Sequence, residues 1–439
     1  MSNSLQLLQI PINDIKPYPL RARLHNSAQR KKMKRSLQQY GQIVPIIVDP
    51  SGTIVDGHLV WEAMKELGLP TISAVRAEGR SAVEIKGLRH ALNRLPQDSR
   101  WDNVALKEEF TQLMALSFDM ELTMFEAAEI DAVLKLDLPE ANVADDEDAI
   151  PGVPEMAISK KGDMWVLKNH RILCGDALSA DDLTMLMAGE AARMVISDPP
   201  YNVPIDGFVS GLGKIRHREF AQASGEMSDK QFTDFLTSAV SIMASNACDG
   251  ALLYLFMDWR HTWNLLEAGR GNQLELVNLS VWVKNNAGMG GLYRSQHELV
   301  LIFKSGTAPH YNNVELGKHG RSRSNVWSYR GLSSFSADRN ELLSAHPTVK
   351  PVSLLSDAIR DVTKRGDIVL DTFLGSGSTL IAAEETGRVC RGLEIDPLYV
   401  DVAIRRWQKL TGRDAVHAVT GATFDEVCER QSQKEVAHG

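Results

Sequence analysis

The 439-residue chain lacks any apolar run of the roughly 18 residues that a membrane-spanning helix needs, and its N-terminus lacks a charged segment followed by an apolar one. These absences argue against a membrane partner and a signal peptide, so we expect a cytoplasmic location. Cysteine is scarce, with four residues and no CxxC pair. Scattered cysteines are typical of reduced thiols, and we expect no metal site.

Positive charge is lacking as well, because the formal net charge is −8. A protein that handles DNA usually needs a positive surface for the phosphates. The acidic residues, however, are concentrated between residues 137 and 159, where seven of them occur without a Lys or Arg. This composition predicts an acidic linker between folded units. We therefore divide the chain into residues 1–90, a helical extension at 91–136, the linker at 137–159 and a larger domain at 160–430.

One stretch of the larger domain combines a strand with an abrupt polar turn. The apolar residues 194–196 predict a buried strand, and Asp198, Pro199, Pro200 and Tyr201 follow it. The prolines remove two backbone donors and restrict φ, which keeps the carbonyls of the turn directed outward. A carboxylate, an exposed carbonyl and an aromatic ring suit the binding of a planar ring that carries an amino group. A proline turn with a surface tyrosine is the alternative interpretation.

A second stretch runs from an apolar strand at residues 367–371 through a glycine turn into a helix at 378–386. Another strand follows and ends at Glu394, which lies 19 residues after Gly375. An acid at this spacing can bind the ribose hydroxyls of an adenosine cofactor. The third glycine of the dinucleotide fingerprint is absent, and no pyrophosphate cradle is evident. The pattern therefore favours an adenosine cofactor without phosphates over a nicotinamide.

The two stretches, DPPY at 198–201 and DTFLGSGST at 371–379, resemble the amino-group DNA methyltransferases that use S-adenosylmethionine. DPPY comes first, which resembles the beta class, and HPTVKP at 346–351 is similar to the motif that leads into that class's cofactor half. The resemblance covers about residues 160–412 and implies an α/β fold with a Rossmann-like methyltransferase sheet. It also implies cofactor contacts from Asp176, Thr348, Lys350, Asp371, Phe373, Gly375, Gly377, Ser378, Thr379 and Glu394.

The resemblance assigns the chemistry to the DPPY residues, Asp198, Pro199, Pro200 and Tyr201. Asp198 and the Pro199 carbonyl are expected to accept hydrogens from the target amine, which would improve a poor nucleophile. Tyr201 is expected to stack on a base that has been swung out of the duplex. The proline-cysteine dipeptide expected of carbon-5 cytosine enzymes is absent, so no covalent cysteine is implied.

The N-terminal region alternates short strands and helices between residues 8 and 80. Its stretches GQIVPIIVD and IVDGHLVWEAMKELGL resemble the small α+β ParB/sulfiredoxin-like domain. The paired arginines of that family's nucleotide box are missing from residues 57–61, so CTP hydrolysis is not implied. The basic run at residues 30–35 lies on one predicted helix, where it either follows a phosphate backbone or forms a solvated face.

Residues 304–345 interrupt the apolar pattern with basic residues, glycine, serine and aromatics. We interpret this segment as a target-recognition insert, with a disordered loop as the alternative. Arg321 and Arg323 are expected to contact phosphates or base edges, and Lys284, at the end of a predicted strand, is expected to assist them.

The sequence thus predicts an adenine-N6 DNA methyltransferase joined to a ParB-like domain, with S-adenosylmethionine as cofactor and double-stranded DNA as partner. Cytosine-N4 methylation is an alternative, although that activity usually has Ser in place of Asp198. Two alternatives belong to other functional classes. One is a ParB-like regulator whose methyltransferase half is not catalytic, and the other is a methyltransferase that acts on protein or RNA. A homodimer and a restriction or phage-encoded partner are left open.

Overall fold

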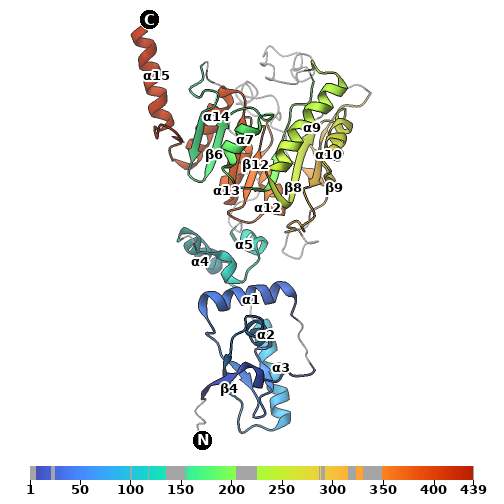
Figure 1. Cartoon of the computed structure of the whole chain (residues 1–439), viewed down its shortest axis with the longest axis vertical. Helices are drawn as coiled ribbons and strands as arrows, with labels where there is room; N and C mark the ends of the chain where they lie inside the picture. Colours follow the sequence, from blue (N-terminus) through green and yellow to red (C-terminus); the bar gives the residue numbers. More distant parts are fainter. Residues whose placement is uncertain are drawn as a thin grey trace. The chain divides into compact units, whose positions relative to one another are not determined.

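A computed structural model describes residues 6–20, 25–98, 101–116, 118–134, 154, 156–203, 225–285, 287, 292–314, 323–329 and 349–438. The chain divides into two compact units, Met1–Leu136 and Asp137–Gly439 (Figure 1). Most of the predicted linker at 137–159 lies outside the described residues. Among the described residues, no helix combines the length and the apolar content that a membrane crossing requires.

The first unit is built on a small mixed sheet with the strand order β1-β4-β2-β3. Its apolar core includes Trp61, Met64 and Ile72, all buried. Helix α1 begins after the capping box of Asn26 and Gln29 and ends at Gly41, whose φ of 70° favours glycine. The elements of this unit are β1 (Leu7–Pro11), η1 (Ile12–Asp14), α1 (Ser27–Tyr40), β2 (Ile46–Val48), β3 (Ile54–Asp56), α2 (His58–Glu66), β4 (Thr71–Arg76), α3 (Ala82–Asp98), α4 (Asn103–Ala115), η2 (Met120–Thr123) and α5 (Ala127–Leu134).

Four of the five basic residues in the run on α1 form ion pairs within their own unit. Lys34 lies 2.7 Å from Glu66 of α2, and Lys32 lies 2.5 Å from Glu126. Arg35 pairs with two further carboxylates, those of Asp119 and Glu121. These pairs reduce the positive charge available to a phosphate backbone, so the structure favours the solvated-face interpretation of this helix. The predicted boundary at residues 90 and 91 falls within α3.

The second unit contains a mixed sheet with the strand order β11-β9-β10-β8-β7-β12-β13-β6-β5-β14 among the described residues. Strands β8, β7, β12, β13 and β6 are parallel, as expected for the α/β class, and β10 runs antiparallel between β8 and β9. Strands β5 and β6 form an antiparallel hairpin next to β13. The strands are β5 (Met164–Leu167), β6 (His170–Cys174), β7 (Ala192–Ser197), β8 (Ala247–Met257), β9 (Glu275–Val283), β10 (His297–Lys304), β11 (Val326–Ser328), β12 (Ile368–Asp371), β13 (Val389–Glu394) and β14 (Val416–His417).

Helices cover both faces of this sheet, so the central strands are apolar on both sides. In β7, Met194 and Ile196 pack with one set of helices, whereas Val195 packs with the other. One face carries α12 (Val352–Val362), α13 (Ser378–Thr386) and α14 (Pro397–Thr411), and the opposite face carries α7 (Ala180–Met187), α9 (Asp229–Ser245) and α10 (Thr262–Gly271). The last helix, α15 (Phe424–His438), projects away from the sheet (Figure 1).

The described part of the predicted insert at 304–345 contributes to the core. Trp327 lies in β11, is buried, and stacks on Tyr254 of β8 with ring centroids 6.2 Å apart. The Tyr329 hydroxyl donates a hydrogen bond of 2.8 Å to Asp357 of α12. Trp327 and the half-buried Tyr329 therefore contribute to the packing of the second unit.

Candidate active site at the carboxyl edge of the sheet

The site forms where the strand order of the sheet reverses. From β7 the chain continues through α9 to β8, whereas from β12 it continues through α13 to β13 on the other side. Because β7 and β12 are parallel neighbours, the segments after Ser197 and Asp371 leave the same edge of the sheet. In open α/β sheets, ligands bind at this point. The fold thus brings together two motifs that lie more than a hundred residues apart.

The DPPY segment after β7 is anchored on both sides. Asn202, with a φ of 53°, accepts hydrogen bonds from the backbone N–H groups of Gly225 and Met227 and donates one to the Met227 carbonyl. Asn is one of the residues that tolerate this left-handed conformation. Upstream, the Ser197 hydroxyl donates a 2.7 Å hydrogen bond to Asp371. The segment between these anchors is therefore held in a defined conformation.

Asp198 contacts two donors in this structure. The Tyr201 hydroxyl donates to its Oδ1 at 2.5 Å, and the Lys350 ammonium donates to its Oδ2 at 2.5 Å. The ring of Tyr201 lies beneath the same ammonium, with 5.6 Å between Nζ and the ring centroid. Lys350, which the resemblance places among the cofactor contacts, thus lies at the DPPY carboxylate.

Glu298, which the sequence analysis did not identify, completes this cluster. It lies at the start of β10, is 8% exposed, and has its Oε2 3.1 Å from both the Tyr201 hydroxyl and the Lys350 ammonium. Lys284, which follows β9, pairs with the other oxygen of Glu298. A single acidic residue near the start of a strand does not indicate such a role in the sequence. Glu298 reaches the site because β10 pairs with β9 so that Glu298 lies opposite Trp282.

The two carboxyls of the cluster differ in acidity. Burial raises the pKa of Asp198, and the nearby Lys350 charge offsets only part of that effect. Burial acts on Glu298 in the same direction, but Lys350 and Lys284 together outweigh it and lower the pKa to about 2. Burial would lower the pKa of Lys350, but the two carboxylates outweigh it and raise this pKa. Glu298 is therefore the firmly ionised partner, and Asp198 is the more basic one.

The buried carboxylate of Asp371 connects the DPPY segment and the glycine loop through hydrogen bonds. It accepts hydrogen bonds from the Ser197 hydroxyl, from the Thr379 hydroxyl at 2.6 Å and from the Phe373 backbone N–H at 3.1 Å. Burial raises its pKa to about 6 despite these donors. Ser378 is also occupied, since it accepts a 3.0 Å hydrogen bond from Arg406. Asp371, Ser378 and Thr379, expected to contact the cofactor, therefore hold the loop in shape through their side chains.

Glu394 occupies the end of β13 beside the glycine loop. Its carboxylate accepts hydrogen bonds from the backbone N–H of Gly375 at 2.7 Å and from that of Asp396 at 2.9 Å. Burial raises its pKa to about 7, against the effect of these two donors. Gly377 has a φ of 85°, and a Cβ there would lie 2.7 Å from the Cβ of Ala403 on α14. The loop thus requires glycine because of helix packing and because of its backbone conformation.

Two further predicted cofactor residues lie at this edge. Asp176 follows β6, the neighbour of β13, and its Oδ1 accepts a hydrogen bond from the Leu178 N–H. Phe373 is half-buried, with its ring 6.2 Å from that of Phe235. Thr372, which directly follows β12 and precedes Phe373, carries a buried hydroxyl that has no hydrogen-bond partner within the described residues. A buried orphan hydroxyl is a position where a ligand's polar group can bind.

Two of the residues predicted to contact DNA, Arg323 and Lys284, form ion pairs within the protein. Arg323 forms ion pairs with Asp361 at 2.9 Å and with Asp357 at 3.2 Å, and donates to the Tyr329 hydroxyl at 2.8 Å. Its side chain is 16% exposed, so it serves the interior of the unit and does not present a free guanidinium to phosphates. Lys284 is likewise engaged by Glu298. Arg321 and Thr348 lie outside the described residues.

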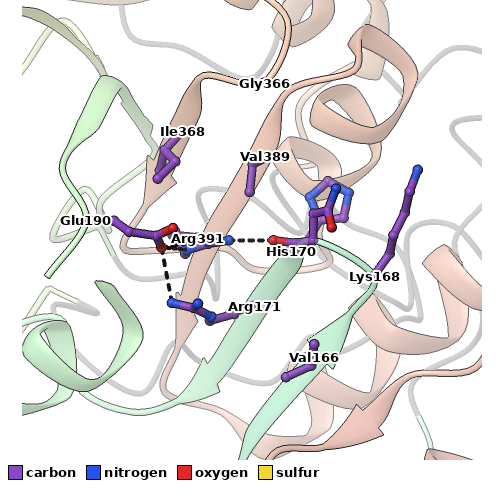
Figure 2. A pocket seen from close by; sticks show the side chains of 10 residues that line it. Val166, Lys168, His170, Arg171, Glu190, Gly366, Ile368, Val389 and Arg391 are labelled. Carbon is purple, nitrogen blue, oxygen red and sulfur yellow. Dashed lines mark hydrogen bonds and ion pairs between the residues drawn. The ribbon is translucent and has the colours of Figure 1, made fainter. Parts of the chain in front are cut away.

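A cavity of about 400 Å³ opens at the opposite, amino edge of the same strands. Its lining includes Arg171 and Arg391, whose guanidinium groups both contact Glu190, at 3.1 Å and 2.6 Å (Figure 2). Arg391 also donates to the Asn169 carbonyl. The charges of this cavity are matched within the protein, and it shares no residue with the DPPY cluster.

Three families match consecutive parts of the chain. Residues 1–88 match the ParB N-terminal domain, residues 104–161 the ParB-methyltransferase HTH domain, and residues 192–405 the DNA methylase family of the N6/N4 type. The second match overlaps the predicted acidic linker. The fold expected from the sequence, a methyltransferase sheet preceded by a ParB-like domain, is confirmed by these matches and by the strand order.

Individual DNA methyltransferases are similar to a little more than half of the chain. The Type II methyltransferase M2.MboI of Moraxella bovis is 24% identical over 255 residues, which is 56% of this chain and 89% of that protein. The crystal structure of M1.HpyAVI in complex with SAM is 21% identical, covers 54% of this chain and 97% of that one, and has a TM-score of 0.40. The cytosine-N4-specific PvuII DNA methyltransferase is 15% identical, covers 60% and 92%, and has a TM-score of 0.44.

Proposed function

We propose that this chain, a DNA methyltransferase of the N6/N4 family with a ParB-type N-terminal domain, methylates the exocyclic N6 of adenine in double-stranded DNA. The observation that carries the proposal is the convergence of two sites at the switch point of the sheet. Asp198 and Pro199 follow β7, the glycine loop follows the adjacent β12, and Glu394 ends β13, the next strand. An amine and a methyl donor bound to these two sites would meet at one edge of the sheet.

The residues present fit S-adenosylmethionine as the cofactor. Glu394 offers a buried carboxylate for the ribose hydroxyls, and the Thr372 hydroxyl, without a partner in the described part of the chain, offers a further polar contact. Phe373 and Asp176 lie at the same edge and are proposed to border the adenosine. When bound, S-adenosylmethionine supplies a methyl group that is already activated by its positive sulfur. The protein's remaining task is to improve the amine.

Asp198 is proposed to act directly on that amine. An exocyclic amine conjugated into a base is a poor nucleophile, and a carboxylate that accepts its hydrogen raises the electron density on nitrogen. Burial raises the pKa of Asp198, which makes this carboxylate a stronger hydrogen-bond and proton acceptor than an exposed aspartate. The buried, proline-restricted backbone at Pro199 keeps the second acceptor, its carbonyl, in a fixed direction. Asp in this position supports adenine as the target base.

DNA is proposed to contact the loops that follow β8 and β9. These strands run parallel to β7, so their carboxyl ends lie at the edge that carries Asp198. Trp259 and Trp263 are 56% and 61% exposed after β8, and Tyr293 is 85% exposed in the loop between β9 and β10. Exposed aromatic rings beside a catalytic edge are suited to stacking on unpaired bases. These residues replace Arg323 in the proposed DNA surface.

The experiment combines product identification with one substitution. The protein is incubated with labelled S-adenosylmethionine and mixed-sequence double-stranded DNA, and the nucleosides are separated by mass spectrometry. We expect N6-methyladenine from the wild type. Asp198→Ala should reduce transfer by at least roughly ten to a few hundredfold, the effect of one charged hydrogen bond, while cofactor binding is largely retained.

The outcomes separate the substrate base from the mechanism. Detection of N4-methylcytosine alone would replace the proposed base and keep the role of Asp198, because the same geometry serves either amine. Wild-type transfer by Asp198→Ala would contradict the proposed mechanism. Cofactor binding without transfer to any DNA would favour the regulatory alternative, in which the methyltransferase half is not catalytic.

A further inference from the structure

The carboxylate assigned to the amine is already occupied in this structure. Tyr201 donates a hydrogen bond of 2.5 Å to Oδ1 of Asp198, and Lys350 donates one of 2.5 Å to Oδ2. These are short, charge-assisted contacts of the strong kind. A target amine that approaches Asp198 therefore meets a carboxylate whose negative charge is already shared with two donors of the protein itself. Asp198 becomes a stronger acceptor for the amine when one of these donors is taken over by another acceptor.

Glu298 is an acceptor within reach of both donors. Its Oε2 lies 3.1 Å from the Tyr201 hydroxyl and 3.1 Å from the Lys350 ammonium, so each donor already lies between the two carboxylates. A small shift of either donor toward Glu298 would release an oxygen of Asp198. Lys284 contacts the other oxygen of Glu298 and stabilises its negative charge. Glu298 comes from β10, two strands away from β7, so it can stay fixed while the donor atoms of Tyr201 and Lys350 shift.

Resting on the proposed function, we infer that Glu298 is a positioning residue for the methyl transfer. It takes over the Tyr201 hydroxyl and the Lys350 ammonium when the target amine binds, and thereby frees the Asp198 carboxylate to accept the hydrogens of the amine. The exchange moves hydrogen bonds only and needs no further reactant. It explains why a second buried carboxylate with its own lysine lies behind the DPPY motif.

The acidities of the cluster agree with this exchange. The negative charge of Glu298 contributes to the raised pKa of Asp198. The groups that face Asp198 are Tyr201 from its own segment, Glu298 from β10 with Lys284 from β9, Lys350 from the segment before α12, and Asp371 from β12. Replacing Glu298 by Gln removes one negative charge from this set. The pKa of Asp198 should then fall, and Lys350 should be held more tightly by Asp198.

The test uses single-turnover methylation of DNA by the full chain across a pH range. We expect Glu298→Gln to lower the rate at saturating DNA and cofactor by roughly ten to a hundredfold, with cofactor affinity unchanged. The acid limb of the rate profile should shift to lower pH. Glu298→Asp, which keeps the charge, should recover part of the rate. A matched control is Glu190→Gln, which removes a carboxylate from an ion pair at the opposite edge (Figure 2).

A double substitution gives the sharpest outcome. If Glu298 acts by taking the Tyr201 hydroxyl from Asp198, removal of that hydroxyl should substitute for it. The variant Tyr201→Phe/Glu298→Gln should therefore transfer faster than Glu298→Gln alone, a non-additive effect that a structural role does not predict. This comparison also holds if Glu298→Gln is less stable, because both proteins carry the same substitution.

Each result decides the inference. Wild-type rates in Glu298→Gln, or a reduced rate with an unshifted acid limb, no recovery in Glu298→Asp and no gain from Tyr201→Phe, would overturn it. An inactive wild type would refute the proposed function, and the inference with it. An active wild type whose Asp198→Ala variant is inactive and whose Glu298 variants behave normally would refute the inference alone.

Discussion

The affinity for S-adenosylmethionine should depend on pH through Glu394. Burial raises the pKa of this carboxyl to about 7, so near neutrality it is only half ionised in the cofactor-free protein. A carboxylate accepts two ribose hydroxyl hydrogens well only when it is ionised, whereas the protonated form has one acceptor fewer. Affinity should therefore be full above the pKa and should decline as the pH falls through it. The raised pKa places this decline near neutrality.

The size of the effect follows from the ionised fraction. With a pKa of about 7, that fraction falls from about nine-tenths at about pH 8 to about one-tenth at about pH 6, so affinity should fall about tenfold. Asp371, whose pKa is raised to about 6, titrates mainly in the lower part of this range. The change between about pH 8 and about pH 7 is therefore the part to assign to Glu394.

Isothermal titration calorimetry at several pH values measures this directly. Glu394→Gln should bind the cofactor roughly ten to a few hundredfold more weakly at about pH 8, and its affinity should be nearly independent of pH. Glu429→Gln, which changes an exposed acid on α15, serves as the matched control. A flat pH dependence in the wild type, or the same slope in Glu394→Gln, would refute the assignment of Glu394 to the ribose.

Further predictions concern packing, the revised role of an arginine, DNA contacts and domain structure. Gly377→Val should lower both the thermal stability and cofactor affinity, because its Cβ would collide with α14 and the backbone has a positive φ; unchanged melting would contradict this. Arg323→Ala should destabilise the second unit by roughly 3 kcal/mol, since it removes a largely buried ion-pair partner from both Asp357 and Asp361, and the denaturation midpoint should fall while the salt slope of DNA binding is unchanged. Trp259→Ala with Trp263→Ala should weaken DNA binding in a fluorescence titration and leave cofactor affinity intact; equal DNA affinity would exclude both from the interface. Limited proteolysis should cut within residues 137–159 and yield a larger fragment that binds S-adenosylmethionine, whereas cleavage inside the sheet would disprove the proposed boundary.

Several features were predictable from local chemistry in the sequence. Apolar runs ending in prolines or glycines predicted β7 and the β12–α13 turn, and α13 begins and ends where the sequence placed it. The spacing of Glu394 from Gly375 was informative because a strand, a turn and a helix have nearly fixed lengths. The carboxylate of Glu394 indeed contacts the Gly375 backbone, at 2.7 Å. Strand ends, turns and helix ends depend mainly on residues close together in the sequence, so the sequence alone predicts them.

The tertiary structure decided which charged groups meet. Glu298 is an unremarkable residue at a strand start, yet the antiparallel insertion of β10 between β9 and β8 brings it to Tyr201 and Lys350. Arg323 looked like a DNA contact because its neighbours in sequence are basic and aromatic, but α12 supplies the carboxylates that neutralise it. Composition and periodicity report the surroundings of a residue along the chain. Ion pairs and buried networks depend on strand order and register, which long-range packing sets, and so only the folded protein distinguishes a free charge from a matched one.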